Sequence, residues 1–183
     1  MKTVFQFILL VFLLAIGIWL WFILFPSPEK IIRTRIAKLA RDASFSSNQN
    51  PVVIAYDAQK LGGYFSTNVE VNLDVPGKFN HAFMGREEIV QAAIVARPSV
   101  MGLKVEFPDV NVTVAPDKNS AVADVTLEAT VYGEHDMIVE EMKFTFEKSE
   151  GRWLIKKVET VRTLSQIHIL NFEPVGARFI LFA

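Results

Sequence analysis

The chain has 183 residues, a formal net charge of −1 at pH 7 and no cysteine. That length suffices for one domain and one appended segment. The near balance of 19 basic and 20 acidic residues argues against a nucleic-acid partner, because surfaces that bind nucleic acids carry an excess of positive charge. The lack of cysteine excludes disulfides, thiolate metal ligands and cysteine nucleophiles.

The N-terminal segment is an apolar run over residues 4–25. As a helix it would measure about 33 Å, enough to cross a hydrocarbon core of about 30 Å. Trp19 and Trp21 lie near its C-terminal end, and such rings prefer the membrane interface. A cleaved signal peptide is the alternative, but the run is too long and no small-residue cleavage site follows it. We predict a transmembrane anchor over residues 1–27, with both tryptophans at the membrane interface.

The orientation of this anchor depends on how the basic residues after it are interpreted. Applied literally, the positive-inside rule keeps the following domain in the cytoplasm. The same residues suit the solvated face of a helix, and a short tail before an apolar run is typical of exported, anchored domains. We favour an extracytoplasmic (periplasmic) domain over a cytoplasmic one. The basic residues in question are Lys30, Arg33, Arg35, Lys38 and Arg41.

Three helices are predicted after the anchor. Ser27 is a good N-cap for a first amphipathic helix over residues 28–43. Asn50 and Pro51 cap a second helix, residues 52–61, whose nearly all-apolar surface predicts that it is well buried. A third helix starts in the segment Gly85–Ile89 and is ended by Pro98.

Alternating residues predict an antiparallel sheet over residues 110–164. Apolar side chains occupy the odd positions from 121 to 131, and mainly polar ones the even positions. The run 138–147 repeats this pattern, so one face of each strand is buried. Shorter strands are expected over 64–73, 78–84 and 103–107, and Pro108 should mark a bulge or bend.

The C-terminal tail, residues 166–183, is too apolar for a solvated end. We favour an added edge strand packed on the core. The other interpretation is a segment that contacts a partner or the membrane, with Phe179 and Phe182 in the contact.

The order of these elements resembles the nuclear transport factor 2-like superfamily, which includes SnoaL-like polyketide cyclases, ketosteroid isomerase and scytalone dehydratase. The resemblance covers residues 28–165. It implies an α+β fold in which a curved antiparallel sheet wraps three helices into a cone-shaped barrel, often with a pocket at the open end. The segments that carry it are Gly62–Phe65, Gly85–Ile89, Phe144–Glu147 and Gly151–Trp153.

Enzymes of this superfamily use Asp, His or Tyr side chains inside the cone as general bases. On the apolar face of residues 138–146 the one acid is Glu140. A carboxylate among apolar neighbours has a raised pKa, which suits a general base. The structural alternative is that Glu140 reaches water. We predict it as a candidate catalytic residue.

Other side chains are candidates for the lining of a ligand pocket. The tyrosines have a competing interpretation as core residues, and the histidine as a surface residue. The three histidines of the chain do not have metal-ligand spacing, so we predict neither a metal nor a cofactor. The candidates for the pocket are Tyr56, Tyr64, His81, Met142 and Phe144.

Two functions remain in competition. The first is a single-pass, membrane-anchored and non-enzymatic binding or assembly module, which forms a homodimer or binds a protein partner. This layout is similar to that of the bitopic core component of type IV secretion systems and of Mce-associated membrane proteins. The alternative is a membrane-tethered SnoaL-like enzyme or a binder of a small apolar ligand. We favour the first, with a partner interface on Thr126, Glu128, Thr130, Tyr132, Phe179 and Phe182.

Overall fold

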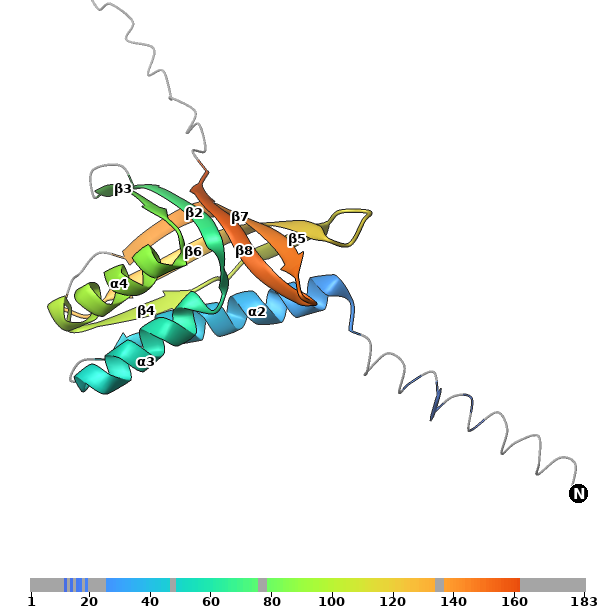
Figure 1. Ribbon diagram of the computed structural model, residues 1–183, viewed down its shortest axis with the longest axis horizontal. Coiled ribbons are helices and arrows are strands. Elements are labelled where there is room, and N and C mark those ends of the chain that lie inside the picture. Colours follow the sequence, from blue (N-terminus) through green and yellow to red (C-terminus); the bar gives the residue numbers. More distant parts are fainter. Residues whose placement is uncertain are drawn as a thin grey trace, which may run out of the picture.

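The computed structural model describes residues 12, 14, 16, 17, 19, 26–46, 49–75, 79–133 and 137–161. Three helices lie on one side of a strongly curved sheet (Figure 1). The elements run in the order α2 (Pro28–Ala43), β1 (Phe45–Ser46), α3 (Pro51–Gly62), β2 (Phe65–Val75), β3 (Phe79–Met84), α4 (Arg86–Ala96), the short 3-10 helix η1 (Arg97–Ser99), β4 (Gly102–Glu106), β5 (Val110–Val114), β6 (Ser120–Val131), β7 (Met137–Ser149) and β8 (Arg152–Thr160).

The predicted anchor and tail fall largely outside the described residues. Trp19 is described and is 65% exposed, whereas Trp21, Phe179 and Phe182 are not described. None of the helices among the described residues combines the length and the apolar character needed to cross a bilayer.

Helix α2 begins and ends where its local sequence predicts. The Ser27 hydroxyl accepts a hydrogen bond from the backbone nitrogen of Lys30 at 3.4 Å, and a proline occupies the first turn. The face toward the sheet carries the buried residues Ile32, Ile36 and Leu39. Burial of each such side chain contributes about 1.5–3 kcal/mol to folding, so α2 is held mainly by this apolar face.

Helix α3 is more exposed than its apolar sequence predicts. The Asn50 side chain accepts hydrogen bonds from the backbone nitrogens of Val52 and Val53, at 2.7 and 3.2 Å. The prediction of a well-buried helix is wrong, because α3 contacts α2 and α4 along one side. Val52 is 75% and Tyr56 is 68% exposed on the other.

Close packing of α3 on α4 depends on a glycine. A Cβ atom at Gly62 would lie 2.6 Å from Cγ2 of Val90, which is closer than real Cβ contacts. Helix α4 follows Gly85, whose φ of 92° belongs to the left-handed region that glycine tolerates. Arg86, the first residue of α4, donates two hydrogen bonds to the carbonyl oxygen of Phe65, at 2.7 and 3.0 Å. These contacts fix α4 against α3 and the start of β2.

The sheet is mixed, in the order β1-β4-β6-β7-β8-β2-β3. The prediction of a purely antiparallel sheet is wrong for one pair, because β2 lies parallel to β8. The alternation of apolar residues reports which face of a strand is buried and carries no information on strand direction. The other pairs are antiparallel.

Strands β4 and β5 pair in succession along one edge of β6. Leu103 to Glu106 pair with the C-terminal part of β6, and Val110 to Val114 with its N-terminal part. The break between them contains Pro108, which confirms the predicted bend. It is closed by a hydrogen bond of 3.1 Å from the backbone nitrogen of Thr126 to the carbonyl oxygen of Asp109.

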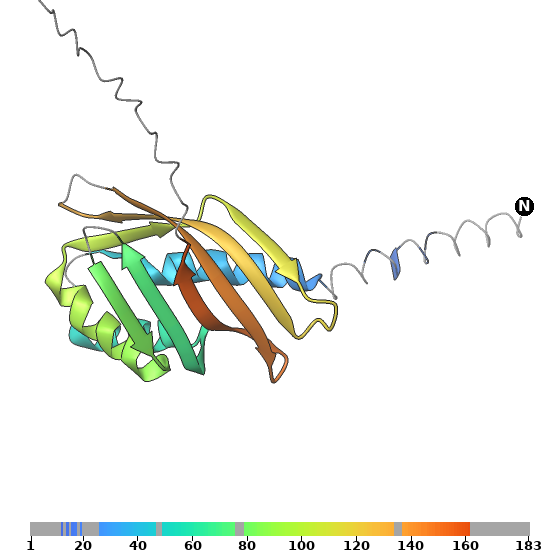
Figure 2. The ribbon, with the colours of Figure 1, turned by 90° about the horizontal axis from the view of Figure 1, so that it is seen from above.

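The core lies on the concave face of the sheet, which the helices cover (Figure 2). Alternate residues of β6 and β7 are buried there in register. The pairs are Ala121 with Phe146, Ala123 with Phe144 and Val125 with Met142. This register confirms the predicted alternation of both strands, and it determines which side chains face the helices and which face outward.

Candidate functional site: a polar cluster and a basic groove at helix α2

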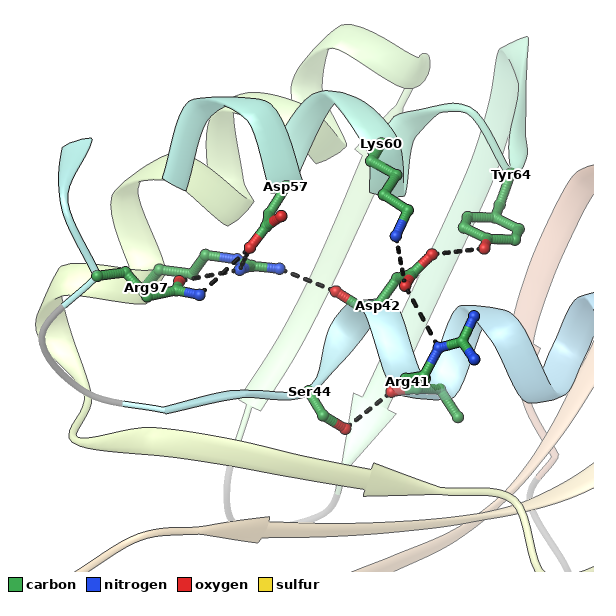
Figure 3. Close-up of polar contacts among 9 residues, drawn as sticks. Arg41, Asp42, Ser44, Asp57, Lys60, Tyr64 and Arg97 are labelled. Carbon is green, nitrogen blue, oxygen red and sulfur yellow. Dashed lines mark hydrogen bonds and ion pairs between the residues drawn. The ribbon is translucent and has the colours of Figure 1, made fainter. Parts of the chain in front are cut away.

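A buried carboxylate joins the end of α2 to the end of α3 (Figure 3). The side chain of Asp42 is 7% exposed. Its Oδ2 accepts a hydrogen bond of 2.6 Å from the Tyr64 hydroxyl, and Lys60 Nζ lies 2.9 Å from its Oδ1. Arg41 Nε lies 3.8 Å from the same Oδ1. Residues from α2, α3 and the turn into β2 therefore share one charged centre.

Burial and hydrogen bonding move the pKa values of Asp42 and Tyr64 in opposite directions. Burial alone would raise the pKa of Asp42, but the hydrogen bonds from Tyr64 and Lys60 and the positive charges of Lys60 and Arg41 outweigh it and lower that pKa. Burial, together with the hydrogen bond to Asp42 and its charge, raises the pKa of Tyr64 to about 12. At neutral pH the pair is a carboxylate and a phenol. Neither group has a pKa near 7, where a general acid or base is most effective.

A buried arginine extends the polar cluster toward η1. The side chain of Arg97 is 3% exposed, and its Nη1 lies 3.2 Å from Oδ2 of Asp57 and 3.1 Å from Oε1 of Gln49. Its Nη2 donates to the carbonyl oxygen of Asp42 at 2.9 Å. The guanidinium carbon lies 4.8 Å from the ring centroid of Phe45. Arg97 thus connects η1 to the end of α2, to the middle of α3 and to the segment before α3.

Sequence reasoning missed this arginine. Its partner Asp57 has a side chain that is 28% exposed. No local motif marks the pair, because 40 positions separate the two residues. The one signal in the sequence is a cation at the C-terminal end of a helix, before Pro98, and this signal names no partner.

A basic groove opens beside the polar cluster, along α2 and the end of α3. Its volume is about 600 Å³, and its lining contains four cations and no carboxylate. Sequence reasoning treated the three cations of α2 as a solvated face and missed the groove, because Lys60 comes from a different helix. The lining residues are Pro26, Lys30, Ile31, Thr34, Arg35, Lys38, Lys60, Gly63 and Tyr64.

Arg35 is the unusual member of this groove. Its Nη2 donates to the carbonyl oxygen of Gly63 at 2.8 Å, and its guanidinium carbon lies 4.9 Å from the ring centroid of Tyr64. Its Nε is buried without a hydrogen-bond partner. Burial lowers the pKa of Arg35, the negative charge that Tyr64 carries when it is ionised opposes this shift, and the positive charge of Arg152 adds to it. Within the described part of the chain, no carboxylate forms an ion pair with this guanidinium.

The candidate base Glu140 lies on the concave side of the sheet. It is half-buried in β7, in register with Leu127 of β6 and two positions from the buried Met142. This is the face on which the alternation placed it, at the border of the apolar core. Its catalytic role stays a prediction.

The residues predicted to line a pocket do not gather in one place. Tyr64, Met142 and Phe144 belong to the packed hydrophobic core. Tyr56 is exposed on α3, and His81 is exposed on β3, with its ring centroid 4.6 Å from that of Phe83. Met142 and Phe144 lie on the buried face of β7, and the alternation in the sequence could show this. The exposure of Tyr56 depends on how α3 packs, and the sequence pattern could not show that.

The outer face of β6 and β7 carries the described part of the predicted partner interface. Thr126, Glu128 and Thr130 are half-buried, and Tyr132 is 51% exposed. Sequence reasoning missed two exposed apolar residues on the same face, Met137 and Val139. Among the described residues, no group of three or more His, Cys, Asp or Glu side chains could hold a metal ion.

Comparisons with known proteins give a fold. No family model matches the sequence, and no curated protein matches it. A nuclear transport factor 2-like protein of unknown function from Pseudomonas putida is similar in structure, with a TM-score of 0.54 and 12% identity over 72% of this chain and 84% of that one. A candidate scytalone dehydratase from Novosphingobium aromaticivorans has a TM-score of 0.54 and 13% identity, covering 72% of this chain and 80% of that one.

A third neighbour, also from Novosphingobium aromaticivorans, is a nuclear transport factor 2-like protein with a cystatin-like fold. It has a TM-score of 0.51 and 19% identity, and the match covers 70% of this chain and 79% of that one. At these identities the likeness extends to the fold and no further. The curled mixed sheet with three helices on its concave face is therefore the cone-like α+β fold of nuclear transport factor 2-like proteins.

Proposed function

We propose that the protein is a single-pass, membrane-anchored domain of the nuclear transport factor 2-like fold that acts as a non-enzymatic binding or assembly module. The outer face of β6 and β7 is its interface, with the apolar tail as a further contact. One observation carries this proposal. Tyr132, Met137 and Val139 expose 51%, 52% and 50% of their surfaces on this side of the sheet.

These side chains are neighbours in the register of the sheet. Thr130 pairs with Met137 and Glu128 with Val139, and opposite residues of an antiparallel pair point to the same face. The Tyr132 ring lies over Gly102, where a Cβ atom would come within 2.4 Å of it. Contiguous exposed apolar residues with polar neighbours mark interaction surfaces, and Tyr and Met are enriched in such interfaces.

The anchor in this proposal is supported by the composition of residues 4–25. A domain fixed to a membrane is confined to two dimensions, so a weak self-interaction or partner interaction is strengthened by the raised effective concentration. An interface of modest size then suffices, and an extracytoplasmic domain would meet its partner in the same compartment.

Assembly is tested on the full chain in a mild, uncharged detergent by size-exclusion chromatography with light scattering. We expect a dimer or a complex with a co-purifying protein. Val139→Glu should release monomers, because it places a charge in the apolar contact. Val52→Glu, at an exposed valine of α3, is the matched control and should leave the assembly unchanged. A wild-type chain that stays monomeric and free of co-purifying protein at every protein-to-detergent ratio, including the most concentrated, would contradict the proposal.

The alternative is a membrane-tethered enzyme, or a binder of a small apolar ligand, that uses the interior of the cone. It is favoured by the half-buried position of Glu140 beside the apolar core and by the likeness to a candidate scytalone dehydratase. An apolar molecule that stays bound through purification would decide for this alternative.

A further inference from the structure

The basic groove has a charge excess that its own lining does not balance. Lys30, Arg35 and Lys38 come from α2 and Lys60 from α3, and the lining contains no acid. Asp42 contacts only Lys60 of these four among the ion pairs of the described residues. Like charges held together around a concave surface attract an anion.

The guanidinium of Arg35 has a fixed position in this groove. Its guanidinium is held by the Gly63 carbonyl and the Tyr64 ring rather than by a carboxylate. A half-buried cation with an unpaired Nε is costly to desolvate, and a bound anion would offset that cost. Arginine is suited to phosphate because its planar fork presents several donors to phosphate oxygens.

The position of the groove indicates which phosphate would reach it. Pro26 lines the groove and directly follows the predicted membrane segment, residues 4–25. Two exposed lysines of α2, Lys30 and Lys38, lie on the same groove. Basic residues next to a membrane segment bind anionic lipids in this way.

We propose that this groove binds the phosphate of an anionic phospholipid head group in the leaflet beside the predicted anchor. The inference rests on the proposed membrane anchorage and adds a ligand class to it. Lys30 and Lys38 contact the head group from the open side, and the Arg35 guanidinium supplies the fixed charge at its inner wall. Lys60 is shared between the lipid and Asp42.

The test is a thermal-shift titration of the full chain in an uncharged detergent, with short-chain phosphatidylglycerol as the probe. A ligand that binds the native state stabilises it by RT ln(1 + c/Kd) at a free ligand concentration c, so Tm rises with both the concentration and the affinity of the ligand. We expect phosphatidylglycerol to raise Tm, and short-chain phosphatidylcholine and inorganic phosphate at equal concentration to leave it unchanged. The double variant Lys30→Gln/Lys38→Gln should weaken the apparent Kd by about tenfold or more.

Arg33→Gln/Lys104→Gln is the matched control, because it removes two cations outside the groove, and both of these residues line a different surface. Equal losses in the two double variants would overturn the proposal in favour of unspecific surface charge. An equal shift with phosphatidylcholine, or with inorganic phosphate, would overturn the anionic lipid as the ligand.

Carbonate extraction of membranes separates this inference from the proposed function. A chain that resists extraction but shows no shift with phosphatidylglycerol retains the anchor and loses the lipid site. A chain released by carbonate has no anchor, whatever the titration shows.

Discussion

At the scale of single residues, the contact between Tyr64 and Asp42 makes the stability of the protein depend on pH. The pKa of Tyr64 is raised to about 12, above its ordinary value of 10.0. The stability that this shift contributes is therefore complete below pH 10 and is lost as the pH rises through about 12. The pKa of Asp42 is lowered, so its contribution is present above the ordinary carboxyl pKa and disappears as the pH falls through the lowered one.

Tyr64→Phe should lower the free energy of unfolding at pH 7 by about 1–3 kcal/mol, because it leaves the buried Asp42 carboxylate without one donor. The loss of wild-type stability between pH 10 and pH 12 should shrink in this variant, since the titrating phenol is gone. Urea unfolding at pH 7, 10 and 12 measures both effects. Tyr56→Phe is the control, because Tyr56 is 68% exposed. A Tyr64→Phe chain as stable as wild type would show that the hydrogen bond contributes nothing.

Residue identities predicted part of this polar site. Tyr64 was expected either in a pocket or in the core with a satisfied hydroxyl, and it lies in the core with Asp42 as its acceptor. Arg97 and Arg35 could not be assigned roles in advance. Their surroundings are set by contacts between residues far apart in the chain, such as Arg97 with Asp57, and a charge by itself does not indicate its partner.

At the scale of elements, the packing of α3 on α4 depends on the missing side chain of Gly62. Alanine favours a helix over glycine by about 1 kcal/mol, but a Cβ atom here would meet Cγ2 of Val90 at 2.6 Å. Overpacking of this kind costs about 1–3 kcal/mol. We therefore expect Gly62→Ala to be destabilising in spite of its helix propensity.

The double variant Gly62→Ala/Val90→Ala distinguishes this clash from other causes. Removal of the Val90 methyl groups should make the Gly62→Ala change neutral or favourable, which a double-mutant cycle of urea unfolding measures as a coupling energy. If Gly62→Ala lowers the free energy of unfolding equally in the wild-type chain and in the Val90→Ala chain, the contact with Val90 is not the cause.

Element boundaries were predicted well where the signal is local. The serine and proline at the start of α2 cap it within one turn, and the alternation along β6 and β7 predicts which of their residues are buried. The exposure of α3 and the parallel pairing of β2 with β8 were not predicted. Both depend on which elements lie side by side, and apolar periodicity does not determine that.

At the scale of the whole molecule, the proposed interface and the proposed lipid site lie on different elements. The interface is on the outer face of β6 and β7, and the groove is on α2 and α3. An anchored domain could therefore contact lipid and a partner at the same time. Substitutions at one site should leave the other unchanged, since no residue is shared between Tyr132, Met137 and Val139 and the lining of the groove.

The side of the membrane is a further prediction at this scale. We expect protease added to intact spheroplasts to digest the domain, because an exported, anchored domain faces outward. Immunodetection of the domain with and without detergent measures this, and a cytoplasmic protein is the control for intact cells. Protection that is lost only after detergent would place the domain in the cytoplasm, as the positive-inside rule applied literally predicts.

Helix α2 also has a mechanical consequence. Two residues, Pro26 and Ser27, separate residue 25 from the 16-residue helix, which at 1.5 Å per residue is about 24 Å long. Its far end is fixed by the Arg97 contact to the carbonyl oxygen of Asp42. A bilayer segment at residues 4–25 would thus be joined through only two residues to a helix that is packed on the core of the domain. Tilting of that segment would turn the whole cone, and the orientation of the interface toward neighbouring molecules would follow.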